Sequence, residues 1–295
     1  MTRELQGKVV LLTGATEGIG KVAAFELARL GASLTLVGRN REKSERVLAE
    51  IKSATGNQGV ALLLADLSSL AEVRALAAKF AASHDRLDVL ANNAGAVFST
   101  CQHTVDGFER TFALNHLSPF LLTRELWPLL VKTPGARVVT TSSAAHLRGR
   151  IDFDDIARRP SRKAGFGVYS ASKLANILFT RELARRLSPS GAIANCVHPG
   201  FVRSGFGLNN PDLLGLAVKV AAAVAGRTPE KGAETLVWLA ASPAAGKVTG
   251  EYWKDRQVGR TSSAARDDAT AKRLWDFSEQ LCASALGEGR KGNGA

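Results

Sequence analysis

Short apolar runs rich in β-branched residues alternate along the chain with longer segments of helical periodicity. This alternation is typical of an α/β fold, a doubly wound parallel sheet with right-handed crossovers and helices on both faces. No repeat or linker divides the chain, so we expect one domain over residues 1–286 and a disordered tail over 287–295. Strands are predicted at 9–13, 34–37, 60–65, 87–91, 137–141, 192–197 and, at the sheet edge, 248–253. Helices are predicted at 21–30, 41–55, 69–82, 104–131, 168–187, 228–241 and 266–284.

A glycine-rich turn joins the first predicted strand to the first predicted helix. Gly14, Gly18 and Gly20 have the spacing of a dinucleotide-binding loop, which indicates a Rossmann-type sheet. Glycine permits the tight turn, close approach of the backbone to a pyrophosphate, and close packing of helix on strand. A glycine-rich turn without a ligand is the alternative. We expect cofactor contacts from Gly14, Thr16, Glu17, Gly18, Ile19 and Gly20.

The second predicted strand is followed by Gly38, Arg39 and Asn40. An NAD-specific site usually has an acidic residue about twenty positions beyond the glycines, where it holds the ribose 2′-hydroxyl. A guanidinium can instead hold a 2′-phosphate through paired hydrogen bonds. The sequence therefore predicts NADP(H), with Arg39 and Asn40 at the cofactor. The alternative is a surface arginine at the start of a helix.

Polar and small residues follow the third and fourth predicted strands. Asp66, which precedes Leu67, could accept a hydrogen bond from the adenine amino group or cap the next helix. Asn93, Ala94 and Gly95 belong to an Asn-Asn-Ala-Gly stretch, where small side chains let the chain pass beside a ribose. Alone, this stretch also fits an ordinary turn. We expect all five residues to contact the cofactor.

Tyr169 and Lys173 stand four residues apart on one predicted helix and therefore share one face. A phenol titrates near 10 in water, so a pKa of about 7 requires roughly 4 kcal/mol of extra stabilisation of the phenolate. A lysine charge about 4 Å away, at an effective dielectric constant near 20, supplies an interaction of that order. The pair predicts an acid, although a packed tyrosine and a solvated lysine also fit. Asn115, unfavourable inside a helix, indicates a local distortion or a polar task.

The composition narrows the classes of partner. A net charge of +12 fits nucleic acid or an anionic membrane, but the basic residues are spread along the chain without an aromatic-basic motif. We therefore expect an anionic cofactor and no nucleic acid. Cys101, Cys196 and Cys282 are too widely spaced for a disulfide framework or a zinc site, and no metal is expected. The polar N-terminus and the absence of a long apolar stretch predict neither a secretory signal nor a transmembrane segment, and hence a cytoplasmic protein.

The motifs together resemble one family over roughly residues 7–284. The glycine turn, the Asn-Asn-Ala-Gly stretch, Asn115, Ser143, the Tyr-x-x-x-Lys pair and a Pro-Gly pair occur in the order found in short-chain dehydrogenase/reductases. The stretches 142–146, 169–176, 179–183 and 198–200 resemble its retinol-dehydrogenase-like branch.

The resemblance implies a role for each catalytic residue. Ser143 would orient the substrate carbonyl oxygen and Tyr169 would protonate it in reduction. Lys173 would lower the pKa of Tyr169 and contact the nicotinamide ribose, and Asn115 would hold a water in the proton relay behind Lys173. Further cofactor contacts are implied for Pro199, Val202 and Ser204. His198, beside them, is interpreted as a structural residue of the turn.

The expected activity is NADP(H)-dependent reduction of an aldehyde or ketone, reversible to alcohol oxidation, on a lipophilic or retinal-like small molecule. Specificity is expected in residues 146–166 and 201–226. There Leu208, Leu213, Leu214, Leu216 and Val218 would form an apolar lid or simply pack.

Two other functions fit parts of the sequence. The first is a catalytically silent NADP(H)-binding regulator. The second, an epimerase or dehydratase of the extended relatives, usually has a larger C-terminal domain than the sequence beyond Gly200 allows. The resemblance also allows a homodimer or homotetramer in which the helices at 104–131 and 168–187 pair.

Overall fold

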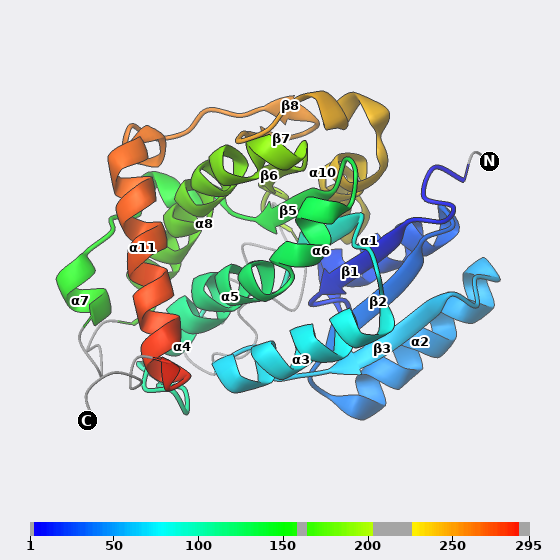
Figure 1. Ribbon diagram of the computed structural model, residues 1–295, viewed down its shortest axis with the longest axis horizontal. Helices are drawn as coiled ribbons and strands as arrows, with labels where there is room; N and C mark the ends of the chain where they lie inside the picture. Colours follow the sequence, from blue (N-terminus) through cyan, green and yellow to red (C-terminus); the bar gives the residue numbers. More distant parts are fainter. Residues whose placement is uncertain (1–2, 158–163, 203–225, 289–295) are drawn as a thin grey trace.

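An eight-stranded sheet forms the centre of the computed structural model, which describes residues 3–157, 164–202 and 226–288 (Figure 1). The strand order is β3-β2-β1-β4-β5-β6-β7-β8. All neighbouring strands run parallel except β7 and β8. The strands are β1 (Val9–Thr13), β2 (Ser33–Gly38), β3 (Val60–Leu64), β4 (Val89–Asn92), β5 (Arg137–Thr141), β6 (Ile193–Val197), β7 (Tyr252–Lys254) and β8 (Gln257–Val258).

Helices cover both faces of the sheet, as predicted. Successive side chains of a strand point to opposite faces, so Leu11 lies in one buried core while Val10 and Leu12 lie in the other. One core is closed by α1 (Gly18–Arg29), α2 (Arg41–Thr55) and α10 (Pro229–Ala241). The other is closed by α3 (Leu70–Ser83), α5 (Ser118–Glu125), α8 (Phe166–Leu187) and α11 (Asp268–Ala285). Short helices are α4 (Arg110–Phe112), α6 (Trp127–Lys132) and α7 (Phe153–Ala157), with η2 (Ala144–Arg148), η3 (Ser188–Ser190), η4 (Pro243–Lys247) and η5 (Ala264–Arg266) of 3-10 form.

The single long helix predicted at 104–131 is wrong. Its first part forms a turn, and Glu109 caps α4 by accepting from the Phe112 N–H at 2.7 Å. The wide π-helical turn η1 (Ala113–Leu117) follows. Pro119 accounts for it, because a proline ring clashes with the carbonyl four residues earlier, here that of Asn115. The distortion predicted at Asn115 is therefore confirmed.

The edge strand predicted at 248–253 is also wrong in position. The strand β7 begins only at Tyr252, and β8 lies outside it as the edge. Asp255 and Arg256 between them have positive φ angles of 53° and 60°, which suit the two-residue turn of a hairpin. Because β8 has two exposed residues, no apolar run marks it in the sequence.

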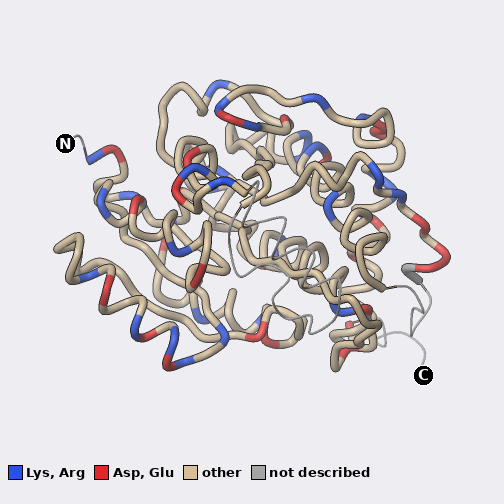
Figure 2. Tube along the Cα trace, turned by 180° about the vertical axis from the view of Figure 1, so that it is seen from behind, with Lys and Arg blue, Asp and Glu red and all other residues tan. Residues whose placement is uncertain are grey.

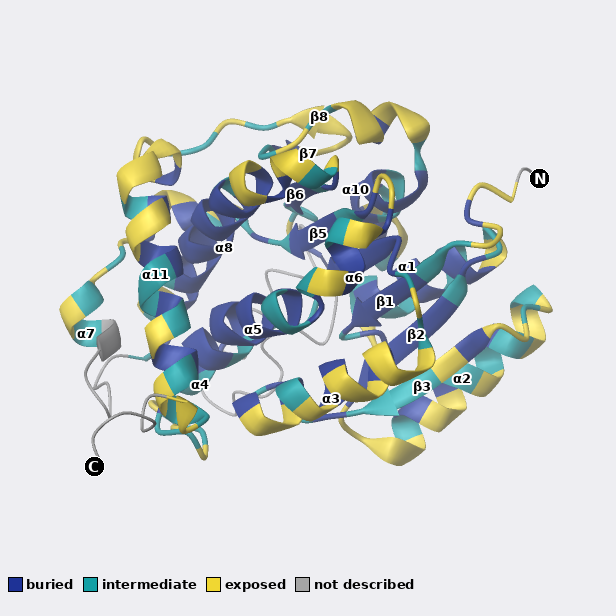
Figure 3. Cartoon of the chain, viewed as in Figure 1, coloured by how far each residue is buried: buried dark blue, intermediate teal, exposed yellow. Residues whose placement is uncertain are grey.

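The helix α8 is buried along most of its length (Figure 3). Part of its cover is α11, whose Trp275 stacks on Phe179 of α8 at a centroid distance of 5.8 Å and meets Phe120 of α5 edge-on at 5.0 Å. The chain thus places its own C-terminal helix against the two helices expected at a subunit interface. The pairing of those helices between subunits stays a prediction.

Charged residues of both signs are interspersed along the described trace (Figure 2). Within residues 3–157, 164–202 and 226–288, no helix combines the length and the apolar character that a bilayer crossing requires. Ser204 and the five apolar residues of the expected lid lie outside the described residues. Of the expected tail, Gly287 and Glu288 are described, and Glu288 accepts from Arg124 Nη2 at 3.1 Å.

Candidate active site

A cleft of about 780 Å³ lies at the carboxyl ends of the parallel strands. It is the place where doubly wound sheets bind ligands. Asn40 and Asn115 are not among its lining residues. The predicted residues that line it are Gly14, Thr16, Glu17, Gly18, Ile19, Gly20, Arg39, Asp66, Leu67, Asn93, Ala94, Gly95, Ser143, Tyr169, Lys173, Pro199 and Val202.

The glycine turn at one wall of the cleft has no room for side chains. Gly14 has a φ of 66°, and a Cβ on Gly20 would lie 1.9 Å from the Gly14 carbonyl oxygen. At the N-cap of α1, Glu17 makes no side-chain capping bond, and among the described residues none replaces it. The first N–H groups of α1 therefore remain available to an anion. This cradle fits the pyrophosphate of a dinucleotide.

Asn93 fixes the shape of this turn from the neighbouring strand. Its Nδ2 donates to the carbonyl oxygens of Thr13 and Gly14, both at 3.2 Å. The Thr13 hydroxyl accepts from the N–H groups of Asn93 and Ala94 at 3.0 Å. The sequence reasoning missed Thr13. A hydroxyl residue between a buried strand and a glycine turn was the available signal.

At the adenosine end of the cleft, the side chains of Ser44 and Thr16 crowd position 38, which is Gly38. A Cβ there would lie 2.2 Å from the Ser44 hydroxyl oxygen and 3.0 Å from Thr16 Cγ2. An acidic residue at position 38, as in an NAD-specific site, would require the Ser44 and Thr16 side chains to move. Arg39 follows, with its side chain 63% exposed and its Nη1 3.7 Å from Asp66 Oδ2.

The side chain of Asp66 holds a turn rather than a helix end. It accepts hydrogen bonds from the Ser68 N–H and hydroxyl at 2.9 and 2.8 Å, whereas Ser69 caps α3. Burial opposes ionisation, but these bonds from Ser68 and the charge of Arg39 lower the pKa of Asp66 below its usual value. Asp66 is therefore a carboxylate at neutral pH.

Asn40 and Lys43 occupy the start of α2 beside this end of the cleft. The Asn40 side chain caps the helix by accepting from the Lys43 N–H at 2.8 Å. The Lys43 ammonium lies 2.5 Å from a carboxylate oxygen of Glu17. No sequence pattern indicates Lys43, because its partner is 26 residues away.

Three of the predicted catalytic side chains meet at the other end of the cleft. Tyr169 and Lys173 share one face of α8 and are 8% and 3% exposed. The Lys173 Nζ lies 5.6 Å from the centroid of the Tyr169 ring. Ser143, just after β5, is hydrogen-bonded through its side chain to Tyr169.

The end of β5 holds Lys173 in place. The Thr141 carbonyl accepts from Lys173 Nζ at 3.0 Å and from Asn176 Nδ2 at 3.1 Å. The Ser142 hydroxyl donates to the Lys173 carbonyl at 2.7 Å. Ser142 therefore joins β5 to α8, in line with the expectation that Ser143 is the catalytic serine of the two.

Asn115 lies behind the cleft and uses its whole side chain for structure. Its Oδ1 accepts from the Ala96 N–H and its Nδ2 donates to the Ala96 carbonyl, both at 2.9 Å. The Nδ2 also donates to the Ser172 hydroxyl at 3.0 Å. Asn115 thereby ties the loop after β4 to α8. The expected role of Asn115 in holding a water of the proton relay stays a prediction.

The His146 side chain contacts the main chain of Ser143, and the sequence analysis did not select His146 as a site residue. Its Nδ1 lies 2.7 Å from the Ser143 carbonyl oxygen, so Nδ1 carries the proton of a neutral imidazole. Burial lowers the pKa of His146, and Nε2 has no hydrogen-bond partner among the described residues. His198 accepts from the Gly200 N–H at 3.3 Å, a bond within its own turn.

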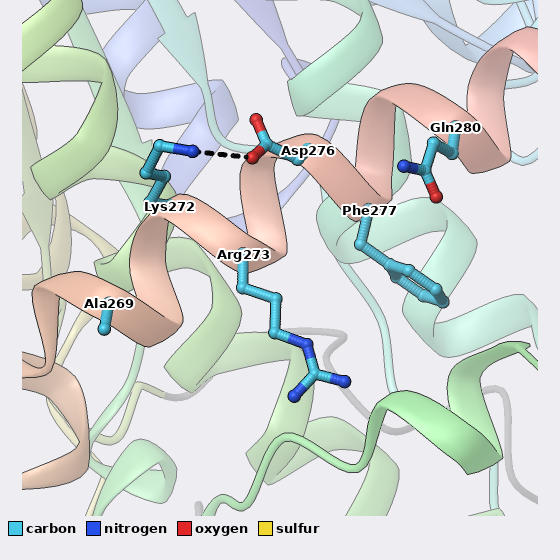
Figure 4. Close-up of a pocket in the computed structure, with 6 residues that line it drawn as sticks. All are labelled: Ala269, Lys272, Arg273, Asp276, Phe277 and Gln280. Atoms are coloured by element: carbon cyan, nitrogen blue, oxygen red, sulfur yellow. Dashed lines mark hydrogen bonds and ion pairs between the residues drawn. The ribbon is translucent and has the colours of Figure 1, made fainter.

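A second hollow, of about 390 Å³, lies on the outer face of α11 (Figure 4). Its charged side chains have partners: Lys272 pairs with Asp276 at 3.1 Å, and Arg273 lies over the Phe153 ring. None of the predicted catalytic or cofactor residues lines it.

Comparison with known proteins agrees with this geometry. The family model of the short chain dehydrogenases matches residues 8–211. The chain belongs to this family. Human dehydrogenase/reductase SDR family member 13 is 39% identical over 286 residues, which cover 96% of this chain and 75% of the relative. Human retinol dehydrogenase 11 is 42% identical over 280 residues, which cover 95% of this chain and 87% of the relative. The resemblance to the retinol-dehydrogenase-like branch is confirmed.

Solved structures of short-chain dehydrogenases share the fold. An uncharacterised protein from Mycobacterium paratuberculosis superposes with a TM-score of 0.74 at 34% identity, covering 94% of both chains. A short chain dehydrogenase from Burkholderia cenocepacia, in complex with NADP, gives a TM-score of 0.67 at 28% identity and covers 84% of this chain and 96% of that one. The chain is an oxidoreductase that acts on alcohol or carbonyl groups with a nicotinamide cofactor.

The pKa of Tyr169 in the structure differs from the value near 7 considered from the sequence. Burial raises the pKa of Tyr169 to about 12, even though the hydrogen bond with Ser143 lowers it. Burial likewise lowers the pKa of Lys173 to about 8. Burial therefore opposes the lowering of the Tyr169 pKa that the charge of Lys173 would supply, and that lowering stays a prediction. Tyr169 is protonated at neutral pH, as an acid for carbonyl reduction must be.

Proposed function

We propose that the protein reduces an aldehyde or ketone with NADPH and oxidises the corresponding alcohol in the reverse direction. The preference for the phosphorylated cofactor rests chiefly on Gly38. A carboxylate at this position would overlap Ser44, whereas Arg39 beside it presents an exposed cation at the edge of the cleft. When bound, NADPH supplies the hydride.

The protein's own groups handle the proton. Tyr169 donates it from its hydroxyl to the oxygen of the substrate, where negative charge develops during reduction. Ser143 donates a hydrogen bond to the same substrate oxygen. The His146 imidazole sets the position of Ser143 by donating to the main-chain carbonyl of Ser143. Lys173, held by the Thr141 carbonyl, places its charge beside the tyrosine.

The remaining predicted cofactor contacts keep their assignments in this proposal. Val202 and Pro199 line the nicotinamide end of the cleft. Asn40, whose side chain caps α2, would contact the cofactor from its position at the start of that helix. Ser204 as a cofactor contact and Asn115 as the residue that holds a relay water complete the set carried over from the family resemblance.

A lipophilic or retinal-like substrate fits the aromatic residues at this end. Phe98, Phe166 and Phe201 line the cleft, and the last two are about half exposed. Exposed phenylalanine side chains beside a catalytic group favour an apolar ligand that covers them. Relatives at about 40% identity are retinol dehydrogenases.

The test is turnover measured as loss of NADPH absorbance against aldehydes and ketones of increasing chain length, with retinaldehyde included and NADH in parallel. We expect turnover with NADPH, and kcat/KM that rises with the apolar surface of the substrate. Higher kcat/KM with NADH would overturn the cofactor assignment. Tight NADPH binding without turnover on any substrate would favour the silent regulator instead.

Where the protein resides in the cell and how many copies assemble stay predictions. Size-exclusion chromatography with light scattering measures the assembly directly. Cell fractionation with a tagged full chain tests the cytoplasmic location.

A further inference from the structure

Two ion pairs stand at the adenosine end of the cleft. Arg39 pairs with Asp66, as described above, and Lys43 pairs with Glu17. Arg39 and Lys43 therefore both already have a carboxylate partner. The second pair is the shorter, with 2.5 Å between the Lys43 ammonium and the Glu17 carboxylate.

Glu17 places a carboxylate at the glycine turn that would hold the phosphates. It lines the cleft directly before Gly18, and its side chain is 61% exposed. A carboxylate at an N-cap normally accepts from the first turn of its own helix, but Glu17 makes no such bond. Its charge instead faces the Lys43 ammonium on another helix.

Lys43 is positioned by the start of α2. Asn40 caps the helix through the Lys43 N–H, which fixes the backbone from which the lysine side chain extends toward Glu17. Arg39 lies just before the same cap, so both cations stand within five residues of each other at one edge of the cleft. A phosphate at that edge can recruit both.

We propose that Lys43 is a second cation for the 2′-phosphate of NADP(H), and that Glu17 competes with the phosphate for it. The pair thereby sets how strongly the protein discriminates between NADP(H) and NAD(H). This inference rests on the proposed NADP(H) preference and deepens it. When the phosphate binds, Lys43 exchanges one anion for another, and the released Glu17 carboxylate remains nearby as a repulsive charge.

Two substitutions separate these contributions. Glu17→Gln keeps the size of the side chain and removes the competing charge. We expect NADPH to bind about three- to tenfold more tightly and NADH to change less than about twofold. Lys43→Gln should weaken NADPH binding about three- to tenfold and leave NADH unchanged within the same limit.

The double variant tests the coupling between the two residues. If Glu17 acts through Lys43, the gain from Glu17→Gln disappears when Lys43 is already glutamine. The matched control is Glu45→Gln, which removes the carboxylate of the exposed Arg41–Glu45 pair on the same helix, outside the cleft lining. Dissociation constants of NADPH and NADH are measured by titration calorimetry at low salt, with melting curves for each variant.

The outcomes are distinct. An equal change in NADPH and NADH affinity on Glu17→Gln, or a gain that persists with Lys43→Gln, overturns the inference. Tighter NADH than NADPH binding in the unmodified protein contradicts the proposed cofactor preference instead. In that case a coupled, NADPH-specific gain in Glu17→Gln still supports the assignment of the pair.

Discussion

The two ends of the cleft differ in how far their charged and titratable side chains are buried. At the catalytic end, Tyr169 and Lys173 are almost fully buried, and Lys173 and its neighbours are held by fixed hydrogen bonds. At the adenosine end, Arg39 and Glu17 are mostly exposed and bonded only through ion pairs. Burial shifts the pKa of Tyr169 to about 12 and that of Lys173 to about 8. No comparable fixed network holds the exposed cations among the described residues.

The difference follows from what each end has to do. Proton transfer to a substrate oxygen benefits from preorganised donors in a site of low dielectric constant, where electrostatic interactions are strong. Recognition of a phosphate needs cations that can exchange partners, which exposed and solvated side chains do at little energetic cost. Substitutions at the buried end should therefore change turnover and stability greatly, and those at the exposed end should change affinity modestly and in a salt-dependent way.

The largest effect is expected for Tyr169→Phe, which removes the proton donor and keeps the ring. We expect kcat to fall about a hundred- to ten-thousandfold, with the NADPH dissociation constant changed only a few-fold. The control is Tyr252→Phe, the only other tyrosine, which also lies buried but is not among the cleft-lining residues. Turnover and titration calorimetry check both. Retention of full turnover in Tyr169→Phe would remove Tyr169 from the mechanism.

The second effect concerns stability, because Lys173 carries a buried charge. Its pKa falls from 10.5 to about 8, which corresponds to on the order of 3 kcal/mol of destabilisation when the lysine is protonated. This cost is complete below pH 8 and is lost as the pH rises to 10.5, since only the unfolded chain then holds the proton. Lys173→Met should therefore abolish most turnover yet stabilise the fold by about 1–3 kcal/mol at neutral pH. Asn176 still donates to the Thr141 carbonyl.

Denaturant unfolding of the two proteins from pH 7 to pH 10 measures this difference. The gain from Lys173→Met should shrink steadily above pH 8. Lys272→Met, at an exposed lysine of α11, is the control and should change stability by less than about 0.5 kcal/mol. A destabilised Lys173→Met protein at neutral pH would show that the bond to Thr141 outweighs the burial of the charge.

The smallest effect is expected at the exposed end. Arg39→Ala should weaken NADPH binding about tenfold at low salt and leave NADH binding unchanged. The loss should shrink as the ionic strength increases, because exposed charges are screened. Arg41→Ala, two residues further along at the start of α2 and outside the cleft lining, is the control. A loss of NADPH affinity in Arg39→Ala that does not depend on salt would show that Arg39 acts as a buried charge, like the residues at the catalytic end.

The alternation of strands and helices and the order of the motifs along the chain could be predicted from the amino-acid sequence alone. These features are local: a buried strand needs a short apolar run, and the four-residue spacing of Tyr169 and Lys173 puts them on one face of any helix. The carboxyl ends of parallel strands meet at one edge, so residues that follow those strands gather in one cleft. Most of the predicted site residues line the cleft for that reason, whereas Asn40 and Asn115 do not.

The pairing and the desolvation of the gathered side chains, in contrast, could not be read from the motifs. The bond between His146 and Ser143 depends on the path of one turn, and the pair of Lys43 with Glu17 joins two helices that are separate in sequence. The pKa of Tyr169 rose instead of falling, because burial acts through all surrounding atoms and no motif encodes it. Spacing along the chain specifies which groups can meet, but their protonation and partners depend on distances and solvent access that arise only when distant segments pack together.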